Sequence, residues 1–260
     1  MTAAIRAEAL KLLRSSVGVL GTVALVGGVL VLVAGLTTAV RAGNPQVIAQ
    51  AGPGAQLDWA GMLAMAMQIT AAGAFLGCGV VLTWMVGREF SDGTISALFA
   101  LPVSVGRIAL GKITVYGLWV VAVHLALAVG LLALGLLLGY GVPDAGVWAG
   151  ILRLFVLGLL TGAIAMPVAW VATLTRSVLA GVGATIGLVA LAQVGVLAGA
   201  GGWFPLAAPA LWAMSGSGTP AVGIASGTTV TGVHVLIVVV TSVLFALLLW
   251  RSWSRLQMDH

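Results

Sequence analysis

Charged side chains are scarce in this chain of 260 residues, where they make up 7% of the sequence, whereas an average soluble domain has about 25%. Carboxylates are the rarest of them, with six against 11 lysines and arginines. Hydrophobic residues account for 61% of the chain, and the mean hydropathy is +1.20. This composition excludes an ordinary soluble domain and indicates an integral membrane protein that lies in a lipid bilayer.

The residues that usually form metal, nucleotide or disulfide sites are also few. Cys78 is the single cysteine, which excludes a disulfide within the chain. The stretch 106–112 approaches a phosphate-binding loop, but Ile113 stands where that motif needs serine or threonine, and no strand precedes it. Met62, Met65 and Met67 could suit Cu(I), yet methionine more often lines an adaptable apolar surface. We predict no catalytic residue, no metal and no cofactor bound by this chain.

What the sequence does contain is a series of long apolar runs. Each is long enough for a helix to cross a bilayer, which takes about 20 residues. The predicted spans are residues 17–40, 59–87, 113–139, 148–175, 178–200 and 229–250. The first run is too long for a cleaved signal peptide and lacks a small-residue cleavage site. The sequence therefore predicts an all-α membrane protein with six transmembrane helices in a single domain, 1–260.

The lysines and arginines indicate how these spans are oriented. With a cytoplasmic N-terminus, nine of the 11 cations fall in inner segments, and the two in outer segments are Arg41 and Arg153. Inner segments of membrane proteins are enriched in these residues. The basic character is thus explained by topology, and we predict no binding of nucleic acid. An even number of spans places both termini on the cytoplasmic side.

Two further segments flank or interrupt the spans. Residues 1–15 mix Arg6, Glu8 and Lys11 with apolar residues, which predicts an amphipathic helix lying along the membrane interface. Residues 201–228 contain the apolar stretch 203–212, which is too short to span and is broken by two prolines. We predict a re-entrant element on the outer side before the last span; an interfacial loop anchored by tryptophan is the alternative.

The stretch 88–112, between the second and third spans, concentrates charge and helix signals in one loop. Gly93 predicts a turn, Thr94 a helix cap, and Pro102 a stop, so residues 95–101 should form a short apolar helix outside the membrane. Ile95, Leu98 and Phe99 share one face of that helix. We expect no span to cover this face, and exposed apolar patches usually mark interfaces.

This loop resembles the first cytoplasmic loop of the type-2 permeases of ATP-binding-cassette (ABC) transporters. The resemblance rests on Glu-x-x-x-Gly-Thr followed by Leu-Pro-Val-Ser and a later lysine, and extends loosely over the six-span layout. It implies a coupling helix that docks on a separate ATP-binding subunit, which binds ATP and Mg²⁺, and a second permease copy, in the inner membrane of a prokaryote. The implied docking residues are Glu89, Asp92, Gly93, Thr94, Ile95, Leu98, Phe99, Leu101, Pro102, Arg107 and Lys112.

The resemblance implies an exporter of amphipathic or apolar cargo such as a drug, antimicrobial peptide or lipid. Residues that could line its pathway are Met62, Met65, Gln68, Gln193 and Phe204. His124 and His234 lie within spans, and we expect neutral rings hydrogen-bonded to a neighbouring helix. A secondary transporter and a non-transporting membrane scaffold are the alternatives; the scarcity of ionisable groups at mid-membrane disfavours a proton-coupled transporter.

Overall fold

The computed structural model describes residues 2–100, 102–215 and 230–256, and all regular secondary structure in these ranges is helical. Six helices are long and apolar enough to cross a membrane, which confirms the predicted number of spans. They are Ser16–Arg41, Trp59–Ser91, Val105–Leu137, Ala145–Thr175, Val178–Leu197 and Gly232–Ser254. Residue Leu101 and residues 216–228 of the predicted outer loop lie outside the described residues.

The first span is not a uniform α-helix. It begins as α2 (Ser16–Thr22), where the Ser15 hydroxyl accepts a hydrogen bond from the Gly18 amide, widens into the π-helical segment η1 (Val23–Gly28), and continues as α3 (Val29–Arg41). After the first span, α4 (Pro45–Ala51) and the 3₁₀ turn η2 (Gly52–Ala55) lead to the second span. Short polar side chains begin these helices because they satisfy the first free amides.

The second span, α5 (Trp59–Ser91), is the central helix of the bundle, and 20 of its 33 residues are buried. It packs against α8 (Ala145–Ala163), α9 (Met166–Thr175) and α10 (Val178–Leu197), and α8 and α9 together form the fourth span. That span breaks at Ile164 and Ala165, just before Pro167 near the start of α9, because proline cannot donate the amide hydrogen bond that a continuous helix requires. The turn between α9 and α10 places Arg176 in the left-handed region, with φ 52°.

The remaining spans lie at the edge of the bundle. α7 (Val105–Leu137) packs on α8 and on α12 (Gly232–Ser254), whereas α10 and α12 leave many large apolar side chains exposed. Between α10 and α12, the turn η3 (Gly201–Trp203) packs against α12, and α11 (Ala208–Ser215) packs against α8, α5 and α12. The re-entrant character of this segment stays a prediction.

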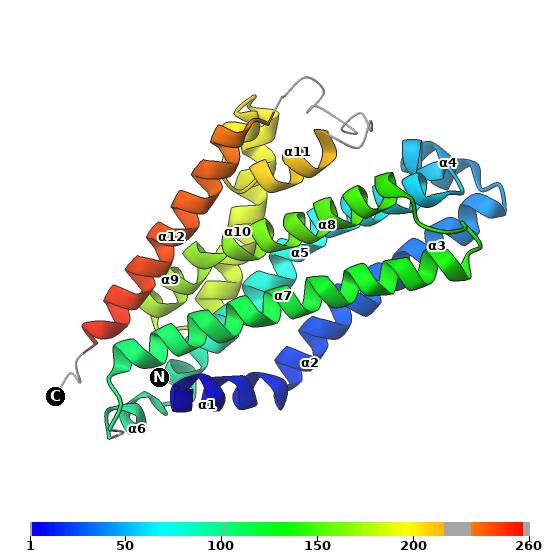
Figure 1. Cartoon of the computed structure of the whole chain (residues 1–260). Coiled ribbons are helices and arrows are strands. Elements are labelled where there is room, and N and C mark those ends of the chain that lie inside the picture. The colour runs from blue at the N-terminus through cyan, green and yellow to red at the C-terminus, as the bar shows by residue number, and fades with distance from the viewer. Residues whose placement is uncertain (1, 101, 216–229, 257–260) are drawn as a thin grey trace.

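Figure 1 shows α1 (Thr2–Leu13), α6 (Ile95–Phe99) and the last turns of α12 at one end of the molecule, and α4 and α11 at the other. α1 crosses the beginning of α7 and does not continue straight into α2. The face that α1 buries is not a purely apolar one, because it contains Glu8 and Leu12, while Leu10 and Leu13 are exposed. A buried carboxylate needs a partner, and its partners define the candidate site.

Candidate functional site at the 88–112 loop

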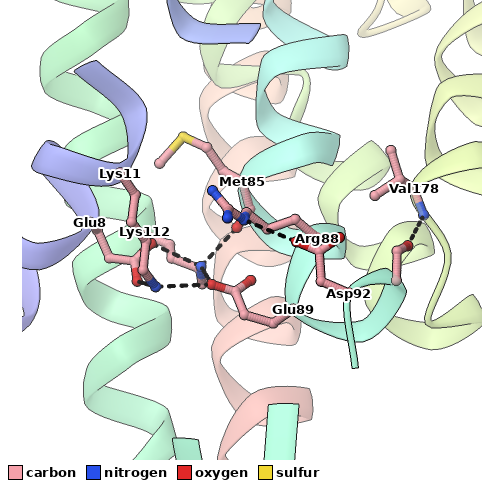
Figure 2. A network of polar contacts seen from close by, with 9 residues as sticks. Glu8, Lys11, Met85, Arg88, Glu89, Asp92, Lys112 and Val178 are labelled. Carbon is pink, nitrogen blue, oxygen red and sulfur yellow. Dashed lines mark hydrogen bonds and ion pairs between the residues drawn. The ribbon is translucent and has the colours of Figure 1, made fainter. Parts of the chain in front are cut away.

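Two lysines and two glutamates meet where α1 crosses the ends of α5 and α7 (Figure 2). The Lys112 ammonium donates to Glu8 Oε2 at 2.8 Å, to Glu89 Oε1 at 2.7 Å and to the Met85 carbonyl at 2.7 Å. An ammonium has three hydrogens, so these three acceptors satisfy it completely. The Lys112 side chain is 1% exposed, and such a buried cation is tolerated because it is fully paired.

Lys11 completes the cluster from the more exposed side of α1. Its ammonium lies 2.6 Å from Glu8 Oε1 and 3.1 Å from Glu89 Oε1. The four side chains therefore alternate in charge and sum to zero. We call Glu8, Lys11, Glu89 and Lys112 the charge network.

The charge network changes the acid–base behaviour of α1. Burial by itself raises the pKa of the Glu8 carboxyl, but the charges and hydrogen bonds of Lys112 and Lys11 outweigh it and hold that pKa below its ordinary value of 4.5. Burial likewise opposes the charged form of Lys11, yet Glu8 and Glu89 hold its pKa above 10.5. Both residues thus keep their charge over the whole physiological range.

The network is also connected to the last span. The Trp253 ring of α12 lies 5.5 Å from the Lys112 nitrogen, and its indole N–H donates to the Thr173 hydroxyl of α9 at 3.0 Å. Trp253 is fully buried and stacks edge-on against Phe90 of α5. One ammonium group therefore joins α1, α5, α7 and α12 at the end of the bundle that contains the loop 88–112.

The loop itself begins after Ser91, the last residue of α5 and two residues beyond Glu89. Gly93 has φ 67°, as the predicted turn requires. Thr94 stands before α6, but it has helical geometry and makes no capping hydrogen bond, so the predicted cap is wrong. Helix α6 is shorter than predicted and ends at Phe99. The Ser91 hydroxyl accepts from the Val178 amide at 3.5 Å, which connects the loop to the start of α10 (Figure 2).

The predicted docking residues fall into two groups. Glu89 and Lys112 are buried inside the chain. Their direct contact with a docking partner stays a prediction, and it would require the charge network to open. The expectation that no span covers Leu98 is wrong, because this residue is 9% exposed and packs in the main core, with Ile95 against it. The exposed members are Asp92, Gly93, Thr94, Pro102 and Arg107, while Phe99 is half-buried.

The sequence reasoning missed Glu8, Lys11 and Trp253 as parts of this site. A signal was present for the first two, because Glu8 is one of only six carboxylates in the chain and Lys11 follows it at helical spacing. Nothing in the local sequence pairs either residue with Glu89, which lies 78 positions after Lys11. That pairing depends on how α1 folds back across α7.

The predicted cargo-pathway residues do not form one cluster. Gln193 lines a pocket of about 200 Å³ between α5, α10 and the 206–214 segment, and the Phe204 ring lies against Gly195 of α10. Met62 and Met65 are 0% and 2% exposed and pack in the interior. Gln68 is partly buried, and its amide nitrogen has no hydrogen-bond partner among the described residues.

Within the part of the chain that the structure describes, His124 hydrogen-bonds inside its own helix and His234 to the residue that caps its own helix, and neither ring bonds to a neighbouring helix, contrary to expectation. His124 Nδ1 lies 2.8 Å from the Val120 carbonyl, and His234 Nδ1 accepts from the Thr231 amide at 3.0 Å in a capping box that begins α12. Among the described residues, no group of three or more His, Cys, Asp or Glu side chains could hold a metal ion.

A family model described as ABC-2 family transporter protein matches residues 4–192. The chain belongs to the ABC-2 transporter family. The matched region of this ABC-2 permease runs from α1 through most of α10, so it includes the charge network and the loop 88–112. No individual curated protein matches the chain. The family and the six spans together make this a multi-pass membrane transport component.

Proposed function

We propose that the chain is the membrane-spanning permease subunit of an ABC exporter, which moves an amphipathic or apolar cargo out of the cytoplasm. ATP hydrolysis would take place on a separate ATP-binding subunit, since members of this family normally work with one and no nucleotide motif is visible in the sequence. A second permease copy would complete the pathway. We propose the inner membrane of a prokaryote, with both termini cytoplasmic.

The observation that carries this proposal is the construction of the coupling end. Helix α6 presents an exposed surface beside Phe99, while Leu98 on its other side is anchored in the core. A force applied to α6 would therefore reach α5 and α7 directly. The charge network fixes α1 to the same two helices, so the interfacial helix and the coupling loop would move together.

For the cargo, the pocket between α5, α10 and the 206–214 segment is the best-supported part of the pathway. Its walls are mainly apolar, as in Phe75 and Leu211, and Gln193 supplies one polar group. A mostly apolar pocket with few polar groups suits amphipathic molecules. We place Gln193 and Phe204 on this pathway; Gln68 stays a predicted member, and Met62 and Met65 would have to become exposed during transport.

The test is transport of a neutral lipophilic dye from cells that express the chain together with an ATP-binding subunit encoded beside it. Export should stop when the nucleotide-binding lysine of that subunit is replaced, and should persist when an ionophore collapses the proton gradient while ATP is maintained. The purified chain alone should hydrolyse no ATP. Export that depends on the proton gradient and does not require the ATP-binding subunit would instead indicate a secondary transporter. If the dye is not exported with any partner subunit, the chain would be a membrane scaffold that does not transport.

A further inference from the structure

Arg153 is a cation within a membrane span that has no carboxylate partner among the described residues. It is the ninth residue of α8, about 12 Å along the helix axis from Ala145. The residue is partly buried, and it takes part in none of the ion pairs that the described residues form. A charge inside a span is costly, so it needs a compensating negative group.

The six carboxylates of the chain do not supply that group within the described residues. The two glutamates belong to the charge network, and Asp92 pairs with an arginine one turn earlier on α5. Asp58 and Asp144 begin α5 and α8, where each accepts a hydrogen bond from a backbone amide. Asp144 lies nine residues before Arg153, about 14 Å away along the helix axis. The sixth carboxylate, Asp259, lies outside the described residues.

The contacts that Arg153 does make are with α11. Its Nη2 donates to the Trp212 carbonyl at 2.7 Å, and the guanidinium carbon lies 5.0 Å from the centre of the Trp212 ring. This carbonyl lies in the last turn of α11, at the negative end of the helix dipole. A carbonyl and an aromatic ring attract a cation, but neither carries a full negative charge. These contacts therefore position the guanidinium without neutralising it.

The nitrogens of the Arg153 guanidinium differ in what can reach them. Nε is buried and has no hydrogen-bond partner among the described residues, so a ligand cannot contact it. Nη1 likewise makes no hydrogen bond to the described residues, but it is not buried. It carries two N–H donors. The accessible end of this cation therefore suits an anion whose oxygens can accept from both donors.

The surface of α8 around Arg153 indicates where such an anion comes from. Leu152 is 61% exposed, and Trp148 is 54% exposed. Large apolar side chains exposed on a membrane span face lipid, and tryptophan is enriched at the level of the headgroups. Arg153 lies only about 8 Å deeper along the axis than Trp148, and an arginine can extend its charged end over that distance toward the interface. An anion that reaches Nη1 along this surface comes from the bilayer.

We propose that Arg153 binds the phosphate group of a phospholipid in the leaflet at the end of the molecule where Figure 1 shows α11. The phosphate oxygens accept from Nη1, and their charge supplies the compensation that the described residues lack. A lipid with a net negative charge, such as phosphatidylglycerol, compensates the cation fully. The site belongs to the permease chain alone and needs neither ATP nor a partner subunit, so it does not depend on the proposed export function.

The test titrates the purified chain, in micelles of a neutral detergent, with a phosphatidylglycerol that carries a photoreactive diazirine beside its glycerol. Peptides that contain residues 148–156 or 208–215 should be labelled. Arg153→Met should weaken this labelling about tenfold or more, as expected for the loss of a hydrogen bond between charged groups. Arg41→Met is the matched control, because Arg41 also donates to a carbonyl at a helix end, that of Leu138 at 2.9 Å, but is exposed. This control should leave the labelling unchanged.

Two further comparisons separate lipid binding from a structural effect and identify the ligand. Trp212→Leu disturbs the same contact between α8 and α11 but keeps the guanidinium, so it should retain the labelling. If Trp212→Leu loses the labelling as completely as Arg153→Met does, the loss reflects the position of α11 and the phosphate site is excluded. Unlabelled phosphatidylglycerol should displace the probe, whereas diacylglycerol, which lacks the phosphate, and inorganic phosphate should not. Equal displacement by diacylglycerol would exclude a phosphate site, and displacement by inorganic phosphate would overturn the assignment to a lipid.

Discussion

At the scale of single residues, the Lys112 ammonium is almost completely buried and is held by three acceptors. Removing one partner of a buried ion pair is far more damaging than replacing the whole pair, because it leaves an uncompensated charge in a low-dielectric region. The four charges of the network sum to zero, so each single substitution leaves one charge unmatched. This arrangement explains how a chain with so few charges can bury three of them, Glu8, Glu89 and Lys112.

Replacing Lys112 should therefore destabilise the fold strongly. We expect Lys112→Met to lower the free energy of unfolding by about 3–5 kcal/mol, because Glu8 and Glu89 then share Lys11 alone. The double variant Lys112→Met with Glu89→Gln restores a neutral cluster and should recover a large part of that loss. Arg107→Met, an exposed cation on the same helix, is the control and should change stability by less than about 0.5 kcal/mol. Denaturant unfolding in mild detergent measures all three, and equal values for Lys112→Met and the control would contradict the network.

The charge network should also give a defined pH dependence. Because the folded pKa of Glu8 lies below 4.5, its contribution to stability is present above that pH and is lost as the pH falls through the folded pKa. Lys11 has a folded pKa above 10.5, so its contribution is present below that pH and is lost only in stronger base. The difference in melting temperature between the wild type and Glu8→Gln should stay constant from about pH 6 to 9 and shrink toward pH 4. A difference that is independent of pH across this range would exclude an ionised Glu8.

At the scale of elements, the sequence predicts what is local and misses what depends on packing. The six spans follow from apolar runs, and the turn at Gly93 follows from a residue that adopts positive φ readily. The π-helical segment of the first span has no such local signal. Burial of Leu98 and of Glu89 could not be predicted either, because both depend on α1, α5 and α7 meeting at one end of the bundle. Of the candidate site, the sequence locates the loop but not the network that supports it.

Helix α6 allows a direct test of docking. Ala97 is exposed on it, and Phe99 is half-buried beside it. Ala97→Arg should block the surface by bulk and charge, and Phe99→Ala removes an interfacial aromatic, which often costs about 2 kcal/mol or more, or roughly thirtyfold in affinity. Both should reduce co-purification of the ATP-binding subunit without changing the amount of permease in the membrane. Ala145 is exposed at the other end of the molecule, so Ala145→Arg is the control. If both α6 variants co-purify the ATP-binding subunit as well as this control does, the loop is only a connector.

At the scale of the whole molecule, the two ends of the bundle differ in charge and in construction. α5 and α7 have 33 residues each, about 50 Å of helix, which exceeds the roughly 30 Å of a bilayer core. Lys112 is the eighth residue of α7, and Glu89 lies two residues before the last of the 33 residues of α5. The network can thus lie at the level of the lipid headgroups, where charged side chains are less costly than at the bilayer centre. The lysine and arginine bias then predicts that this end faces the cytoplasm.

Orientation can be tested with single cysteines in a Cys78→Ala background, since Cys78 is fully buried. Ser91 and Ser254 are exposed at the end that contains the network, and Gln50 is exposed in α4 at the other end. An impermeant thiol reagent added to intact cells should label Gln50→Cys and spare Ser91→Cys and Ser254→Cys. All three should react after the membrane is opened with detergent, which controls for thiol reactivity. Labelling of Ser91→Cys in sealed cells would place the 88–112 loop outside the cell, where no ATP-binding subunit could reach it. That result would contradict the proposed mechanism of export.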